Sequence, residues 1–198
     1  MIPENLTGYK IILASQSPRR KFLLKELGLD FEVSDLHETD EVYPEHLGKF
    51  EIPVYLSELK SSTYGMSLKM SEILITADTI VWFRDQVINK PVDRQDALNI
   101  LSDLSGNMHE VITGVSLRTS ECIRSFYSHS EVYFNTLREK EIEYYVDKYL
   151  PYDKAGGYGI QEWIGYIGIK RINGSYYNVM GLPVEKLYRE LEKIVECK

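Results

Sequence analysis

Residues 9–21 read YKIILASQSPRRK and join an apolar run, a short turn and a basic helix start. The run from Tyr9 to Ala14 is short and apolar, which predicts a buried β-strand. Ser17 followed by Pro18 predicts a helix that begins there, because Ser caps free backbone N–H groups and Pro fits the first helical position. A strand that turns directly into a helix is typical of an α/β fold.

Three cationic residues occupy the first turn of this predicted helix: Arg19, Arg20 and Lys21. A helix N-terminus carries partial positive charge, so cations there are unfavourable unless an anion joins them. A phosphate would meet free N–H groups, hydroxyls and guanidiniums together. The pattern therefore favours a phosphate site over a solvated basic turn. It lacks the Gly-x-x-x-x-Gly-Lys spacing of a P-loop.

Strand patterns continue through the chain, first between helices and later one after another. The run at 73–83 is rich in Ile, Val, Thr and Trp, which predicts a strand with a return at 87–88. Alternation with period two predicts two antiparallel strands between 110 and 134. We expect a further strand over 164–172, followed by a hairpin turn at Asn173-Gly174. The sheet is therefore expected to be mixed and partly antiparallel.

Helices are predicted between these strands and at the end of the chain, so that they flank the sheet. They begin near Pro53, after Asp93, at about Leu137 and at Pro183. The chain has 198 residues and no linker rich in Pro, Gly and Ser. We therefore expect one α/β domain over 1–198.

The charge of the chain excludes one class of partner. It carries 23 Lys+Arg and 30 Asp+Glu, a formal net charge of −7, whereas nucleic-acid binders usually have a basic balance. We expect no nucleic-acid partner. Residues 31–60 hold eight acidic and two basic residues. Such a run is usually a solvated loop, but one of its acids could supply an oxygen ligand to a divalent cation; the candidates include Asp35, Glu38, Asp40 and Glu41.

Targeting signals are missing from the sequence pattern. No apolar run approaches the ~20 residues of a membrane helix, and the N-terminus lacks the features of a signal peptide. The two cysteines, Cys122 and Cys197, match neither a metal motif nor a disulfide framework. We expect a cytoplasmic protein without a membrane partner.

Asp78 stands inside the apolar run at 73–83. An ionised acid is costly to bury unless it is paired or binds a metal. A carboxylate near a strand end could hold Mg²⁺ or activate a water, and it could also cap a turn. Spacing alone leaves these alternatives open.

Three more positions have the chemistry to contact a nucleotide. Lys60 and Lys90 could reach a phosphate, although on spacing alone an exposed lysine is the plainer interpretation. Residues 154–161 read KAGGYGIQ, in which three glycines allow close backbone approach to a ligand. Gln161 ends this segment and offers a donor and an acceptor for a base edge. A flexible loop with a surface Gln is the alternative.

Together these segments resemble the Maf family of nucleoside triphosphate pyrophosphatases, from Ile11 to about Leu191. The resemblance rests on LASQSPRR at 13–20, ADT at 77–79, KP at 90–91, DKAG at 153–156 and YGIQ at 158–161. It implies an inosine-triphosphatase-like fold with a two-lobed cleft, and often a homodimer.

The resemblance also implies a reaction. Family members are hydrolases acting on acid anhydrides: water attacks the α-phosphorus of a nucleoside triphosphate, which gives the monophosphate and pyrophosphate, with Mg²⁺, Mn²⁺ or Co²⁺ as cofactor. YGIQ at 158–161 and GSYYNV at 174–179 look like the dTTP/UTP branch rather than the branch acting on N7-methylated GTP. CTP and modified pyrimidine nucleotides are further candidate substrates, and the implied role is nucleotide-pool housekeeping.

Roles are carried over position by position. Asp78 matches the proposed proton acceptor, and Glu38 with Asp78 is our choice for metal binding. The positions that match the phosphate cradle are Ser15, Arg19, Arg20, Lys60 and Lys90. Those that match base selectivity are Arg19, Thr79 and Gln161.

A second class of function stays open at this point. The chain could be a nucleotide-binding regulator of cell division, a septum formation inhibitor with little catalysis. Asp78 and the lysines favour the enzyme, because a pure binder needs no acid that activates water.

Overall fold

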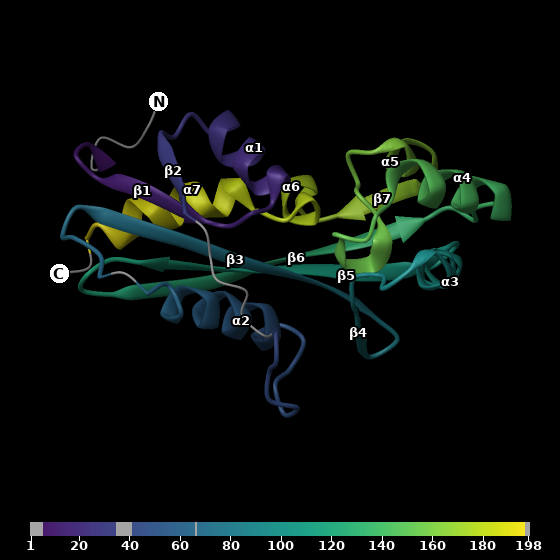
Figure 1. Ribbon diagram of the computed structural model, residues 1–198, viewed down its shortest axis with the longest axis horizontal. Helices are drawn as coiled ribbons and strands as arrows, with labels where there is room; N and C mark the ends of the chain where they lie inside the picture. Colours follow the sequence, from purple (N-terminus) through teal and green to yellow (C-terminus); the bar gives the residue numbers. More distant parts are fainter. Residues whose placement is uncertain (1–5, 35–40, 66, 197–198) are drawn as a thin grey trace. The chain divides into compact units, whose positions relative to one another are not determined.

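The computed structural model describes residues 6–34, 41–65 and 67–196 (Figure 1). Within these residues the chain forms a seven-stranded sheet flanked by helices, which confirms the predicted mixed α/β class. The elements are β1 (Lys10–Ala14), α1 (Pro18–Glu26), β2 (Phe31–Ser34), α2 (Glu51–Ser62), β3 (Glu72–Phe83), β4 (Gln86–Ile88), α3 (Arg94–Leu104), β5 (Met108–Arg118), β6 (Ile123–Phe134), α4 (Glu139–Tyr149), the 3₁₀ turn η2 (Ala155–Gly157), α5 (Trp163–Gly168), β7 (Ile169–Asn173), α6 (Tyr176–Met180) and α7 (Val184–Ile194).

The strand order is β2-β1-β3-β5-β6-β7, and β4 pairs with β3. β1 runs parallel to both neighbours, so that Ile11 lies opposite Phe31 on one side and Ile73 on the other. β4 is antiparallel to β3, and β7 is antiparallel to β6. The predicted mixture of parallel and antiparallel pairs is confirmed.

Two compact units make up the chain. The first holds residues 1–78, 113–128 and 181–198, and the second holds 79–112 and 129–180. The single domain over 1–198 and its two-lobed cleft stay predictions. Each unit has its own buried residues and its own hydrogen bonds between helices, strands and loops.

In the first unit, β1 and the start of α1 form as the sequence predicts. Residues 11–14 of β1 are buried, and Pro18 is the first residue of α1. The Ser17 hydroxyl accepts a hydrogen bond from the Arg20 N–H at 3.4 Å, which caps the helix. Gly28 follows the helix with φ +79, a conformation that glycine adopts without strain.

Helices cover both faces of the strands in the first unit. Figure 1 shows α1 and α7 on one face and α2 on the other. The Thr76 hydroxyl of β3 donates to the Ser57 carbonyl of α2 at 2.7 Å. α7 buries Leu187, Leu191 and Ile194 at the helical spacing that the sequence predicts.

In the second unit, α3 packs against α4. The Arg94 guanidinium donates to both oxygens of Asp147, at 2.6 and 2.9 Å. Asp93 caps α3 as predicted, since its carboxylate accepts from the Asp96 N–H at 2.8 Å.

Two sequence predictions in the second unit are wrong. Residues 163–168 form α5, so the strand predicted over 164–172 is shortened to β7. A short apolar run fits either structure, and a Cβ at Gly165 would lie 1.8 Å from the Ile160 carbonyl oxygen, so glycine allows this close approach. Gly174 adopts φ +129 in a turn, but α6 follows it in place of a hairpin strand. The Ser175 hydroxyl caps α6 by accepting from the Asn178 N–H at 3.3 Å.

We predict that Gly114→Ala destabilises the first unit. A Cβ at Gly114 of β5 would lie 2.2 Å from the carbonyl carbon and oxygen of Pro53 in α2, so α2 would have to move. The free energy of unfolding should fall by about 1–3 kcal/mol in denaturant titrations. Gly65→Ala is the control, because a Cβ there meets nothing within 4 Å. Equal stability of both variants would contradict this packing.

Candidate functional site

The residues predicted for the site fall in both units. Glu38 lies outside the described residues. The first unit contains Ser15, Arg19, Arg20, Lys60 and Asp78, and the second contains Thr79, Lys90 and Gln161.

Asp78 of β3 is held by a lysine from the neighbouring helix. Only 6% of Asp78 is exposed, and its carboxylate forms an ion pair with the Lys60 ammonium of α2. The same ammonium contacts the Glu41 carboxylate at 2.9 Å. One largely buried ammonium therefore joins two acids that are far apart in the sequence. Burying a carboxylate this deeply is costly unless a cation or a hydrogen-bond donor accompanies it.

Glu41 is the site residue that sequence reasoning underestimated. It stands in the acidic run as one of several equivalent acids, and the resemblance favoured Glu38 instead. Its contact with Lys60 places it beside Asp78, about half of its side chain being exposed. Spacing holds no signal for the contact between Glu41 and Lys60, because the path of the chain before α2 decides it.

Arg20 connects three segments of the first unit. Its Nε donates to the Gly181 carbonyl at 2.9 Å, and its Nη1 donates to the Ala77 carbonyl at 2.8 Å. Nη1 also lies 3.5 Å from the Ser15 hydroxyl oxygen. Burial lowers the pKa of the Arg20 guanidinium, and the negative charge of Asp78 acts in the opposite direction. Arg20 therefore fixes the start of α1 beside the residue that precedes Asp78.

Ser15 belongs to the same arrangement. It is buried, and its hydroxyl accepts from the Ser17 N–H at 3.3 Å. Arg19, on the first turn of α1, is half-buried. The start of α1 thus offers backbone N–H groups, hydroxyls and two guanidiniums within one turn. These are the groups that bind a phosphate.

In the second unit, residues 154–161 form a packed loop. Residues 156–160 are buried and Gln161 is half-buried, so most of this loop does not lie at the surface as the alternative supposes. Gly156 and Gly157 adopt φ +71 and +69. A Cβ at Gly156 would lie 2.9 Å from a Val81 methyl group, and its N–H donates to the Asn89 carbonyl at 3.3 Å. The loop therefore packs beside the segment that carries Lys90, which is itself exposed.

Gln161 ends this loop with an unusual polar group. Its Oε1 is buried and accepts no hydrogen bond from any of the residues that the structure describes. A buried acceptor without a partner is costly, and such groups often mark functional positions. Oε1 is suited to accept a hydrogen bond from a ligand N–H group. Thr79, in the same unit, is half-buried.

The described residues hold no group of three or more His, Cys, Asp or Glu side chains that could bind a metal on their own. Asp78 and Glu41 form a smaller set of oxygen donors, and both contact the Lys60 ammonium. Mg²⁺ is commonly bound by one or two carboxylates, with waters and substrate phosphates completing its shell. The donor chemistry therefore fits a divalent cation that binds together with a triphosphate.

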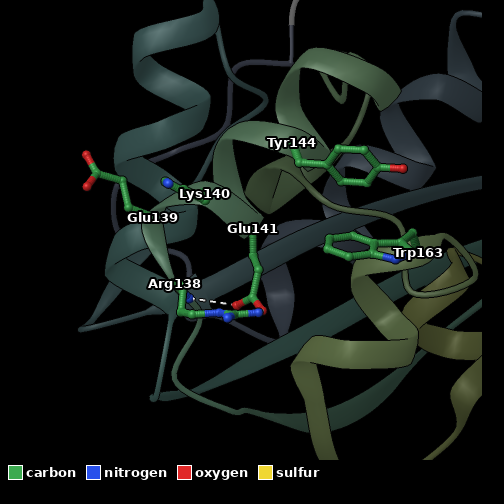
Figure 2. A pocket seen from close by; sticks show the side chains of 6 residues that line it. All are labelled: Arg138, Glu139, Lys140, Glu141, Tyr144 and Trp163. Carbon is green, nitrogen blue, oxygen red and sulfur yellow. Dashed lines mark hydrogen bonds and ion pairs between the residues drawn. The ribbon is translucent and has the colours of Figure 1, made fainter.

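A pocket of about 640 Å³ lies elsewhere in the second unit, over the start of α4 (Figure 2). The rings of Tyr144 and Trp163 meet edge to face on one side, and Arg138 pairs with Glu141 on the other. It is lined by Arg138, Glu139, Lys140, Glu141, Tyr144 and Trp163. This lining contains none of the residues predicted for the site.

No helix within the described ranges is long and apolar enough to cross a membrane.

The solved structure of the Staphylococcus aureus Ham1 protein aligns with 93% of this chain and 99% of that chain, with a TM-score of 0.48 and 16% identity.

Much closer relatives exist among proteins called dTTP/UTP pyrophosphatase. The protein from Bacteroides thetaiotaomicron is 55% identical over 190 residues, which cover 96% of this chain and 98% of the relative. The protein from Parabacteroides distasonis is 54% identical over 189 residues, with the same coverage. The protein from Flavobacterium johnsoniae is 45% identical and covers 98% of this chain and 100% of the relative.

The family model described as Maf-like protein matches residues 10–194. It therefore includes the start of α1, Lys60, Asp78 and the loop that ends at Gln161. Since this model spans nearly the whole chain and the relatives match from end to end, the chain belongs to the Maf-like protein family.

Proposed function

We propose that this chain is a nucleoside triphosphate pyrophosphatase that hydrolyses dTTP and UTP to the monophosphate and pyrophosphate. The names of its relatives support this substrate class. The observation that carries the proposal is the buried Asp78 carboxylate, paired with Lys60 and next to the residue that Arg20 binds. A carboxylate beside a helix start that carries phosphate-binding groups is suited to receive a proton from an attacking water.

The triphosphate is assigned to the cationic groups. The start of α1 with Ser15, Arg19 and Arg20 offers N–H and guanidinium donors, and Lys60 adds an ammonium. Lys90 is proposed as a further phosphate contact. These charges give a local attraction for a polyanion, although the net charge of the chain is −7.

A divalent cation, Mg²⁺, Mn²⁺ or Co²⁺, is proposed to bind at Asp78 and Glu41, with Glu38 as the further acid that the family resemblance suggests. The support is the sharing of one ammonium by the Asp78 and Glu41 carboxylates. When bound, the cation would neutralise phosphate charge and lower the pKa of a water. Asp78 accepts the proton of the attacking water, and the arginines orient the phosphates.

Base selectivity is assigned to Gln161, with Arg19 and Thr79 as further candidates. Thymine and uracil present an N–H between two carbonyl oxygens. The buried Gln161 Oε1 can accept from that N–H while the side-chain amide donates to a neighbouring carbonyl. At the same two positions cytosine presents an acceptor nitrogen and an amino donor. Binding of CTP therefore requires the Gln161 side-chain amide to flip. A homodimer, a cytoplasmic location and a housekeeping role stay predictions.

The first test is Asp78→Asn on a panel of nucleotides. The wild type with Mg²⁺ should release pyrophosphate from dTTP and UTP faster than from purine triphosphates. The variant should lose about 10²–10⁴-fold in kcat, because it cannot take up a proton, yet keep its affinity for a non-hydrolysable dTTP analogue. Normal turnover by the variant would refute the role of Asp78. A wild type that binds the analogue but hydrolyses nothing would favour the regulator.

The second test is removal of the metal. Treatment with EDTA should abolish pyrophosphate release, and added Mg²⁺ or Mn²⁺ should restore it. The Mn²⁺ affinity of the complex with the dTTP analogue, measured by paramagnetic relaxation of water, should fall in Glu41→Gln. Glu45→Gln, another acid of the same run, is the matched control. Full turnover after metal removal would contradict the proposed cofactor.

The third test compares the two arginines. Arg19→Ala and Arg20→Ala should each weaken binding of the dTTP analogue by about tenfold, since each removes a charge-assisted contact to phosphate. Arg20→Ala should also lower the free energy of unfolding by about 1–3 kcal/mol, because the Ala77 and Gly181 carbonyls lose their donors. Calorimetric binding titrations and denaturant unfolding measure the two effects. Unchanged affinity in both variants would exclude the phosphate cradle.

A further inference from the structure

We propose that Tyr145 and Glu162 are positioning residues that fix the Gln161 side chain and so set the selectivity for the base. This inference rests on the proposed function, because it takes Gln161 as the residue that contacts the base. Both residues belong to the second unit, as Gln161 does.

The Tyr145 hydroxyl joins α4 to the loop on both sides of Gln161. Tyr145 is fully buried, at 0% exposure. Its oxygen accepts from the Gly159 N–H at 2.9 Å, and its O–H donates to the Glu162 carboxylate. Burial and the Glu162 contact both raise the pKa of the Tyr145 phenol, so the hydroxyl keeps the proton that it donates. One hydroxyl thus holds the residues at positions 159 and 162.

Glu162 is itself held by a buried cation. Its carboxylate lies 3.3 Å from the Lys154 ammonium, which also contacts Asp153 at 2.7 Å. Lys154 is 7% exposed and the Glu162 side chain is 19% exposed, so this ion pair is largely removed from water, whereas Asp153 is exposed. A buried charge network of this kind keeps a definite geometry while each member is paired, and loses it when one member is removed.

The side chains of Glu162 and Gln161 lie together over Gly159. A Cβ at Gly159 would be 2.7 Å from Glu162 Cδ and 3.0 Å from Gln161 Nε2. Displacement of the Glu162 carboxylate therefore changes the space in which the Gln161 amide sits. Since the amide presents a donor at one end and an acceptor at the other, its orientation decides which base edge it matches.

A separate contact anchors the preceding residue. The Tyr158 hydroxyl lies 2.7 Å from His109 Nε2, and both rings pack edge to face with Phe134. Burial lowers the pKa of His109 to about 3, so the imidazole is neutral near pH 7. Because this anchor does not involve Tyr145, loss of the Tyr145 hydroxyl should leave the loop folded and shift only the part near Gln161.

The test is Tyr145→Phe, which removes the hydroxyl and keeps the ring. The readout is kcat/KM for dTTP divided by kcat/KM for dGTP. We expect this ratio to fall about three- to tenfold, the factor that one hydrogen bond is worth, mainly through a higher KM for dTTP. Tyr149→Phe is the matched control, because Tyr149 stacks on Tyr145 with ring centroids 5.1 Å apart on the same helix, and it should keep the ratio.

A second background separates positioning from general stability. In Gln161→Ala, Tyr145→Phe should change the dTTP to dGTP ratio no further, since the group that it positions is gone. Glu162→Gln keeps an acceptor for Tyr145 but loses the charge that pairs with Lys154. It should lower the dTTP to dGTP ratio when Gln161 is present and leave the ratio unchanged in Gln161→Ala. It also serves as the test if Tyr145→Phe fails to fold.

Three results would overturn the inference. The ratio could survive Tyr145→Phe and Glu162→Gln in a selective, active enzyme, which leaves the proposed function standing. The ratio could fall equally with and without Gln161, which would show a general structural role. A wild type that releases pyrophosphate from no nucleotide would overturn the proposed function and this inference together.

Discussion

The ion pair between Lys60 and Asp78 is the interaction on which the candidate site depends. A carboxylate in the middle of a buried strand is unstable unless a cation accompanies it, and α2 supplies that cation. This requirement explains why α2 must pack closely on β3 and β5, where Gly114 leaves space for the Pro53 carbonyl. It also explains the position of Glu41, which shares the ammonium at 2.9 Å. Packing and chemistry are thus linked through one lysine.

Helices and strands with strong capping residues or a clear hydrophobic period could be predicted from the sequence. The capped start of α1 at Ser17 and Pro18, the buried strand β1 and the amphipathic α7 follow from local propensity and period. The segment at 163–168 could not be predicted, because its helix depends on the contact between Gly165 and the Ile160 carbonyl, a feature of packing. For the site, the family resemblance pointed to Asp78 and Lys60, but their pairing and the contact of Glu41 with Lys60 depend on how separate segments meet.

Polar residues of the site have structural roles that the sequence pattern does not show. The sequence predicts Arg20 as a phosphate contact. In the structure its guanidinium also donates to the main-chain carbonyls of Ala77 and Gly181, so this side chain holds segments of the first unit together as well. The glycine-rich loop before Gln161 was open to interpretation as a mobile surface segment. It is buried and tied by Tyr145 through Gly159 and Glu162. The net charge of −7 likewise describes the far field and not the groups that surround Asp78.

The central claim is that the proposed reaction proceeds by attack of water on the α-phosphorus of a nucleoside triphosphate. Hydrolysis of dTTP by the wild-type chain in ¹⁸O-labelled water, followed by mass spectrometry of both products, tests it most directly. Attack at the α-phosphorus places the new oxygen in the monophosphate. The account predicts ¹⁸O in dTMP and unlabelled pyrophosphate. Label in the pyrophosphate, or release of orthophosphate with dTDP, would contradict it.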